Sequence, residues 1–314
     1  MRASMLILLI VVAFSLGGCG DSNKETITIS GAWALYPLTI RWAEEYQKIH
    51  PDVKIEVSAG GAGKGMTDAL AEAVDIGMVS REIYPAEIEK GAFWVSVSKD
   101  AVVPMTNADN PVIGEILKKG ITRETFEKIW VTEEITKWQD ALSGDVTGRS
   151  SIHVYTRSDA CGAAETWARY MGHHQEDLQG IGVFGDPGLA DAVRKDFVGI
   201  GYNNINFAYD AGTKRPAGGV RVIPIDLNGD GRIDESEDFY KSRDGVVKAI
   251  AEGRYPSPPA RNLHFVTQGI PEREVVKDFM EWTITEGQKY VDKAGYIALP
   301  KATLDEQLKK LKGN

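Results

Sequence analysis

Residues 155–170 place a permanent positive charge beside the start of a predicted helix. Arg157 ends an apolar strand pattern, and a helical pattern begins near Gly162. The first amides of a helix lack intrahelical partners and lie at the positive end of the helix dipole. Combined with a guanidinium that stays protonated, these amides can bind an oxyanion. The segment therefore predicts an anion site. The alternative is a capped helix in which Arg157 pairs only with Asp159.

Residues 226–237 have the spacing of a calcium-binding EF-hand loop. Its oxygen ligands would be five side chains and the backbone carbonyl of Arg232: Asp226, Asn228, Asp230, Asp234 and Glu237 supply the side chains. Gly231 stands where such loops turn sharply. Because a strand precedes the loop and a helix follows it, we expect one structural Ca²⁺ site rather than a paired sensor. The alternative is a solvated acidic loop without metal.

Cys161 suggests a less favoured function, a thiol enzyme. A cysteine at a helix N-terminus beside Arg157 is expected to have a lowered pKa. A thiol enzyme also needs a base, and no contact is predicted between Cys161 and His153. Residues 60–65 are rich in glycine but lack the P-loop spacing, so they predict an amide nest rather than a nucleotide site. We therefore expect no enzymatic activity.

The first 19 residues have the pattern of a lipoprotein signal peptide. Arg2 precedes an apolar run over residues 5–16, which is shorter than the roughly 20 residues that span a bilayer. The Leu16-Gly-Gly-Cys19 sequence is similar to a lipobox, so we expect Cys19 to carry lipid and residues 20–26 to form a tether. The protein would then be anchored outside the cytoplasm, in the periplasm or at the cell surface. The alternative is an ordinary cleavage site.

Composition narrows the possible partners and the architecture. The chain has a formal net charge of −9 and two cysteines. It has no basic stripe with interleaved aromatic residues, which argues against a nucleic-acid partner. With Cys19 lipidated, Cys161 has no cysteine left with which to form an intramolecular disulfide. The roughly 295 residues after the leader are enough for two lobes with ordinary cores.

Short β-branched strands alternate with amphipathic helices, which predicts an α/β fold. Strands are expected at residues 26–30, 53–57, 75–80, 93–98, 101–106, 151–156, 197–202 and 220–225. Helices are expected at residues 38–48, 66–73, 121–138 and 272–294. The first five elements read β-α-β-α-β, and the loops at the ends of such strands are where open α/β sheets bind ligands.

Four segments resemble substrate-binding proteins of ABC importers, of the phosphate-binding type, and they occur in the expected order. They are residues 31–37 before a helix with Trp42, the glycine-rich turn followed by residues 75–81, residues 157–162, and a C-terminal set formed by Tyr255-Pro256, 263–269 and 287–296. The resemblance implies a type II periplasmic-binding-protein fold with a ligand cleft between two α/β lobes. It implies a first lobe over 27–106, crossing near 107–111, a second lobe over 107–208, and a return to the first lobe over 209–314.

The resemblance also implies which residues form the ligand site. These are Ala34, Leu35, Tyr36, Gly61, Ala62, Gly63, Ser80, Arg81, Arg157, Asp159, Cys161, Gly162 and Ala163. Several depart from the family pattern: Leu35, Ala62, Cys161 and Ala163 replace hydroxyl residues, and Arg81 replaces an aspartate. Each absent bond to a charged ligand removes roughly 1.5–3 kcal/mol.

These substitutions leave the identity of the ligand open. Phosphate is the family default, and the alternatives are another oxyanion or a small carboxylate with an apolar part against Trp33, Leu35 and Tyr36. The resemblance implies a monomer that delivers its ligand to a membrane permease. A calcium-stiffened surface protein that recruits another protein is the remaining alternative.

Overall fold

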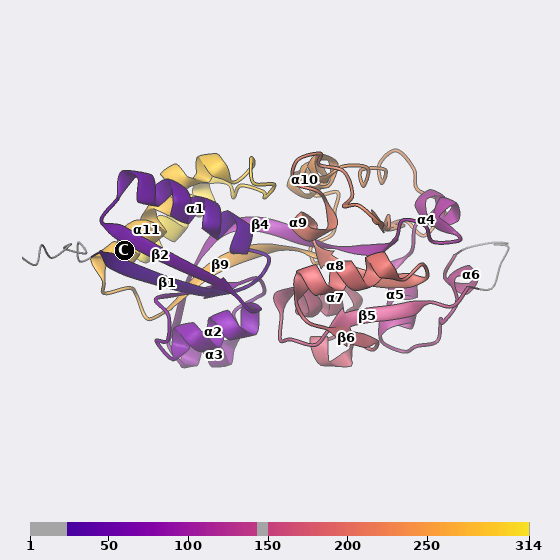
Figure 1. The fold of residues 1–314 in the computed structure, drawn as a ribbon, viewed down its shortest axis with the longest axis horizontal. Helices are drawn as coiled ribbons and strands as arrows, with labels where there is room; N and C mark the ends of the chain where they lie inside the picture. Colours follow the sequence, from indigo (N-terminus) through magenta and orange to yellow (C-terminus); the bar gives the residue numbers. More distant parts are fainter. Residues whose placement is uncertain (1–23, 143–149, 314) are drawn as a thin grey trace, which may run out of the picture.

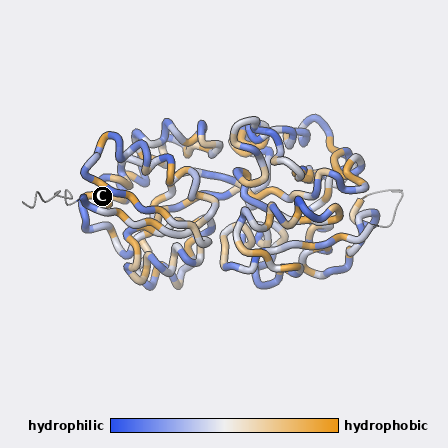
Figure 2. The backbone as a smooth tube through the Cα atoms, in the orientation of Figure 1, coloured by the Kyte–Doolittle hydropathy of each residue, from blue (hydrophilic) through white to orange (hydrophobic). Residues whose placement is uncertain are grey.

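The computed structural model describes residues 24–142 and 150–313, and the predicted signal peptide with Cys19 lies outside these residues. Figure 1 shows two lobes side by side, with β4 (Ala92–Asn107) and β9 (Ala260–Gln268) running between them. Among the described residues, no helix has the length and apolar character needed to cross a membrane. The tube in Figure 2 has hydrophobic stretches inside both lobes, as expected when each lobe has its own core.

The first lobe begins with the predicted β-α-β-α-β unit. Its elements are β1 (Glu25–Gly31), α1 (Tyr36–Ile49), β2 (Val53–Ala59), α2 (Ala62–Leu70) and β3 (Ile76–Val79). Strand β1 pairs in parallel with both β2 and β3. The alternation that predicted β1 is explained by burial, because Ile27 and Ile29 lie in the core. Helix α2 starts four residues earlier than expected, so two glycines of the glycine-rich segment belong to its first turn.

The crossing between the lobes lies inside a strand and not at residues 107–111. Two strands were expected over this region, but β4 is continuous. Its antiparallel partners are β9 over the first part, then β7 (Gly199–Asn204) and β8 (Val220–Val222). The partner changes between Ala101, which pairs with β9, and Val102, which pairs with β7. Asp100, which falls between the two expected strands, lies within β4 and is ion-paired there with Arg261.

The second lobe contains the site-bearing unit β5-α7 and the helices around it. Its further elements are α4 (Ile113–Lys119), α5 (Arg123–Trp130), α6 (Trp138–Ala141), β5 (His153–Arg157), α7 (Gly162–Met171), β6 (Ile181–Val183), α8 (Gly185–Lys195), α9 (Ile205–Ala208) and α10 (Arg243–Ala251). The helix expected over 121–138 is shorter than predicted: it is α5 alone, and α6 begins only at Trp138. Helix α5 begins after the N-cap Thr122, and Glu133, at a φ of 55°, follows its end.

Packing assigns residues 220–255 to the second lobe, whereas the resemblance implied the first. Phe239, Tyr240 and Tyr255 belong to the same buried cluster as Trp130 and Trp167. The return to the first lobe occurs at β9, whose Phe265 joins the other cluster. That lobe is completed by α3 (Pro85–Glu89), α11 (Glu274–Ile284) and α12 (Lys301–Leu311). The long helix expected over 272–294 is shorter: α11 ends at Ile284, and a separate short 3₁₀ helix (Glu286–Tyr290) follows it.

Candidate functional site

The predicted ligand loops of the two lobes meet at the N-termini of α2 and α7. The amide of Gly63 donates to the carbonyl of Ala160 across the interface, at 3.1 Å. A Cβ atom on Gly61 would lie 2.8 Å from that same oxygen, and Gly61 has a φ of +96°, so glycine suits this position. On the other side, a Cβ on Gly162 would overlap Ser80. The structure therefore brings these predicted residues of both lobes into one cradle.

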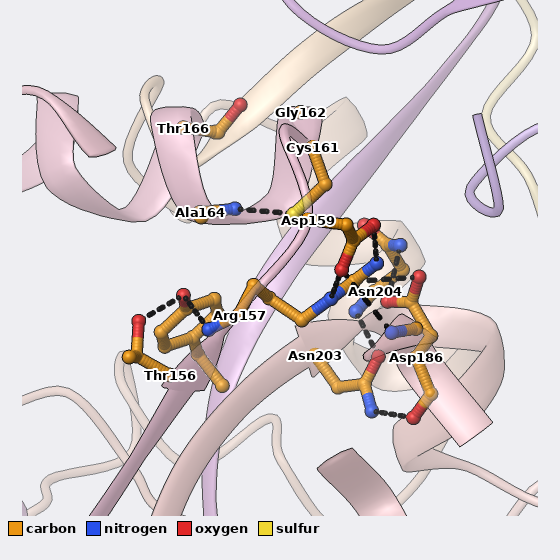
Figure 3. Close-up of polar contacts among 12 residues, drawn as sticks. Thr156, Arg157, Asp159, Cys161, Gly162, Ala164, Thr166, Asp186, Asn203 and Asn204 are labelled. Carbon is orange, nitrogen blue, oxygen red and sulfur yellow. Dashed lines mark hydrogen bonds and ion pairs between the residues drawn. The ribbon is translucent and has the colours of Figure 1, made fainter. Parts of the chain in front are cut away.

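Arg157 lies in this cradle between two carboxylates (Figure 3). Its Nε donates to Asp159 Oδ1 at 2.8 Å and its Nη2 donates to Oδ2 at 2.6 Å. Its Nη1 donates to Asp186 Oδ2 at 2.9 Å. The pairing with Asp159 is the one considered as an alternative from the sequence. It does not exhaust the guanidinium, which has five N–H donors.

Asp186 was not among the predicted site residues. It lies in the first turn of α8, its side chain is 1% exposed, and its Oδ1 accepts from Asn204 Nδ2 at 2.6 Å. Its backbone carbonyl accepts from Asn203. Burial raises the pKa of Asp186, and the charge of Arg157 opposes that shift. With both carboxylates ionised, Asp159, Asp186 and Arg157 carry one net negative charge.

Several backbone donors of the cradle have no acceptor. Among the described residues, no hydrogen-bond acceptor is found for the amides of Gly162 and Ala163 at the start of α7. The same holds for the amides of Ala62 and Lys64 at the start of α2. Free amides at helix starts are groups to which anions bind, so these two helix starts are available to a ligand rich in acceptor oxygens.

The expectation of a lowered Cys161 pKa is wrong. Burial raises the pKa of this thiol to about 12, and the charge of Arg157 only partly offsets the effect. The sulfur acts as the N-cap of α7, because it accepts from the amide of Ala164 at 3.3 Å. His153 is exposed and bonded to Asp196 instead. Cys161 is therefore a capping group rather than a thiolate.

Three of the predicted site residues of the first lobe have side chains that are buried in its core. The side chains of Ala34, Leu35 and Ala62 lie in the core of this lobe, and no exposed surface remains on Leu35 for an apolar ligand. Only their backbones can serve the cradle. Tyr36 is half-buried, with its ring 6.2 Å from that of Trp33. The missing hydroxyl at Leu35 is thus a consequence of core packing.

Arg81 does not act as a free cation in the cradle. Its guanidinium makes two bonds to the carboxylate of Glu87, at 2.9 and 2.7 Å, and lies over the ring of Tyr84. It lines a cleft of about 720 Å³ between the lobes, together with Thr166 and Arg261. The replacement of an aspartate by Arg81 therefore adds no unpaired charge to the anion site.

Within the described residues, the predicted calcium ligands do not form a cluster of three or more acidic, histidine or cysteine side chains spaced to hold a metal ion. The side chains of the 226–237 loop bond to backbone amides instead. Asp226 accepts from Gly229 and Gly231, and Glu237 accepts from Leu227. The first and last positions of the loop, Asp226 and Glu237, are 4% and 2% exposed.

The sequence reasoning also missed a buried polar network behind the cradle. Its members are Asp100, Arg261 and Asn204, all buried. Arg261 pairs with Asp100, and Arg261 and Asp100 are opposite one another in the β9–β4 ladder. The available signal was the presence of a charged residue inside each of two apolar strands, because such charges require a partner.

Comparisons with known proteins agree with this architecture. A family model described as a PBP superfamily domain matches residues 20–286. The phosphate-binding protein PstS of Staphylococcus haemolyticus is 23% identical over 315 residues, covering 95% of this chain and 92% of that protein. The PstS of Methanocaldococcus jannaschii is 26% identical, with coverages of 93% and 90%.

Solved structures show the same fold. A putative phosphate ABC transporter substrate-binding protein from Clostridium perfringens, with bound phosphate, superposes with a TM-score of 0.69 at 22% identity and covers 88% of this chain and 100% of its own. A phosphate transport receptor from Vibrio cholerae gives 0.61 at 21%, covering 87% and 100%. The expected two-lobed fold is confirmed. The family supplies binding components of transporters rather than enzymes, which confirms that expectation as well. The matched model spans most of the sequence, and the chain belongs to the PBP superfamily.

Proposed function

We propose that this protein is the substrate-binding component of an ABC importer and that it binds phosphate in the cradle between its lobes. The free amides at the starts of α2 and α7, placed around Arg157, are the observation that carries this proposal. Relatives named as phosphate-binding proteins, aligned over most of the chain, add to it. A related oxyanion or a small carboxylate is the alternative ligand.

Arg157 retains donors for such a ligand. Its five N–H groups include one on Nε and two on each terminal nitrogen. The bonds to Asp159 and Asp186 use one donor on each of the three nitrogens. One donor therefore remains on Nη1 and one on Nη2. A tetrahedral oxyanion can accept these together with the helix amides, while the carboxylates keep the guanidinium in place.

The proposed setting follows from the leader sequence and the family. We place the protein outside the cytoplasm, attached to the membrane by lipid on Cys19, as a monomer that delivers its ligand to a permease. Two lobes joined by β4 and β9 suit such delivery, because a hinge allows the cleft to open. Recruitment of another protein, without a small ligand, is the competing function.

Isothermal titration with phosphate, sulfate, molybdate, tungstate and acetate tests the proposal. Phosphate is expected to bind, and Arg157→Lys is expected to weaken it by at least about tenfold, since lysine keeps the charge but loses the fork. Arg169→Lys is the control, because Arg169 lies on α7 in the same lobe as Arg157 but is bonded to Glu165 and partly exposed. If none of the anions binds at millimolar concentration, the proposed function is wrong.

The loop at 226–237 is a separate proposal, a structural Ca²⁺ site. Asp226 and Glu237 are almost fully buried, yet no ion pair to either is found among the described residues. Buried carboxylates without a cationic partner are costly, and a hard cation is the partner that this ligand spacing suits. In addition, Ile233 packs against Gly120, which joins the loop to the turn between α4 and α5.

A further inference from the structure

Arg261 occupies the point where the chain passes from one lobe to the other. It faces Asp100 in the β9–β4 ladder, one residue before β4 changes partner from β9 to β7. Its Nε donates to Asp100 Oδ1 at 3.0 Å, and the residue is 8% exposed. The ion pair alone uses only part of the guanidinium. Its terminal nitrogens donate to three further acceptors, two of which lead back to the anion cradle.

The first connection runs through the start of α7. Nη1 of Arg261 donates to the carbonyl of Gly162 and, at 2.9 Å, to Thr166 Oγ1. The Gly162 carbonyl belongs to the same peptide unit as the amide of Ala163, one of the free donors of the cradle. A charged donor on a carbonyl polarises its peptide and makes the attached N–H a stronger donor. Arg261 thus strengthens the Ala163 amide as a donor through the carbonyl on the other side of the same peptide.

The second connection runs through two side chains to Arg157. Nη2 of Arg261 donates to Asn204 Oδ1, and Asn204 Nδ2 donates to Asp186 Oδ1 at 2.6 Å. Asp186 in turn accepts from Arg157 Nη1. The orientation of the Asn204 amide is fixed, because it has a guanidinium on one side and a carboxylate on the other. Every donor in this path therefore meets an acceptor.

We propose that Arg261 is a positioning residue of the anion site, acting through the Gly162–Ala163 peptide and through Asn204 and Asp186. The proposal rests on the proposed function but adds a residue outside the cradle. Arg261 need not touch the ligand. Arg261 lies on β9, a strand that joins the lobes. Its position therefore links the orientation of two donors, the Ala163 amide and the Arg157 guanidinium, to the geometry of the strand crossing. Anion affinity and the geometry of the crossing are then coupled.

Phosphate titration of Arg261→Lys tests the coupling. Lysine keeps one positive charge for Asp100 but cannot reach all four acceptors, so we expect affinity to fall by about tenfold. Arg273→Lys is the control, since Arg273 pairs with Asp75 on the far side of the first lobe. Asn204→Ala should also weaken binding. Combined with Arg261→Lys, its effect should be less than additive, because both changes break the same path.

The amide resonance of Ala163, measured without ligand, separates positioning from general stability. Loss of polarisation in Arg261→Lys should shift its proton upfield, whereas Arg273→Lys should leave it unchanged. Wild-type affinity and an unshifted Ala163 amide in Arg261→Lys would overturn the proposal. Full additivity with Asn204→Ala would overturn the path through Asn204.

Two further cases are distinguishable. If wild-type protein binds no phosphate, the proposed function fails, and the Ala163 resonance still decides the role of Arg261. If Arg261→Lys does not fold, Asn204→Ala is compared with Asn107→Ala, because Asn107 is a buried asparagine of the same lobe whose side chain bonds to the C-terminus of α8 and to its own turn. Equal affinities of these two variants would overturn the proposal.

Discussion

The environment of Arg157 contains one of its two predicted roles and leaves room for the other. The sequence allowed either an anion site or a capped helix with Arg157 paired to Asp159, and the structure contains that pair. The pair leaves donors for the proposed anion, because the guanidinium has more N–H groups than Asp159 and Asp186 use. What the sequence could not reveal was Asp186, which comes from a different element.

The buried thiol of Cys161 is predicted to react slowly with alkylating reagents. Its pKa of about 12, against an ordinary value of 9.0, lowers the thiolate fraction at neutral pH by about three orders of magnitude. We expect alkylation of Cys161 by iodoacetamide, followed by mass spectrometry, to be very slow in native protein and fast in denaturant. Native protein that reacts as fast as free cysteine would contradict the buried capping role.

The loop at 226–237 illustrates what a single element contributes to its lobe. The amide of Asp226 donates to Ile121, and that of Ile233 donates to Lys118, so the loop is fastened to both ends of the turn between α4 and α5. The proposed Ca²⁺ ligands and the backbone bonds to α4 and to the turn after it thus lie on the same short segment. Any ligand that orders the loop should therefore stabilise this edge of the second lobe.

Calcium binding by the loop is tested by thermal unfolding with Ca²⁺ or chelator. At a Ca²⁺ concentration of about one hundred times the dissociation constant, binding adds about 2.7 kcal/mol to the unfolding free energy. We expect Ca²⁺ to raise the melting temperature of the wild type but not of Asp226→Asn. Asp238→Asn should behave as the wild type, since Asp238 is the acidic residue just past the loop and pairs with Lys241. Equal responses of the two variants would argue against the site.

At the scale of the whole molecule, the fold depends on two strands that belong to both lobes. The sequence predicted strands on either side of Asp100, but not that they are one strand with different partners at its two ends. It also gave no sign that residues 220–255 pack with the second lobe. Pairing partners and core membership are long-range properties, and hydrophobic periodicity reports only local structure.

His264, on β9, makes stability depend on pH. Burial lowers its pKa from 6.5 to about 4, with Lys310, Arg81 and Arg261 adding to the effect. The folded state therefore keeps this imidazole neutral, hydrogen-bonded to Ser96. Its contribution is present above pH 6.5 and is lost as pH falls towards 4, because the unfolded chain then binds the proton more readily.

His264→Gln should flatten this dependence. We expect the wild type to lose about 3 kcal/mol of unfolding free energy through His264 between the two pKa values, and the variant to lack that loss. Urea unfolding at a series of pH values measures the difference. A variant with the same pH dependence as the wild type would contradict the burial of a neutral histidine.

Patterns in the sequence were enough to predict the α/β class, the opening β-α-β-α-β unit, the family and the start of α7. Most of these depend on residues close together in the chain, namely alternation, capping and glycines, and the family depends on the order of such local motifs along it. The tertiary contacts were needed to show that Cys161 is a buried capping group, that Arg81 is paired with Glu87, and that Asp186 and Asn204 connect Arg157 to Arg261. Burial and charge pairing between distant segments set pKa values and donor directions, and no local pattern records which segments will meet.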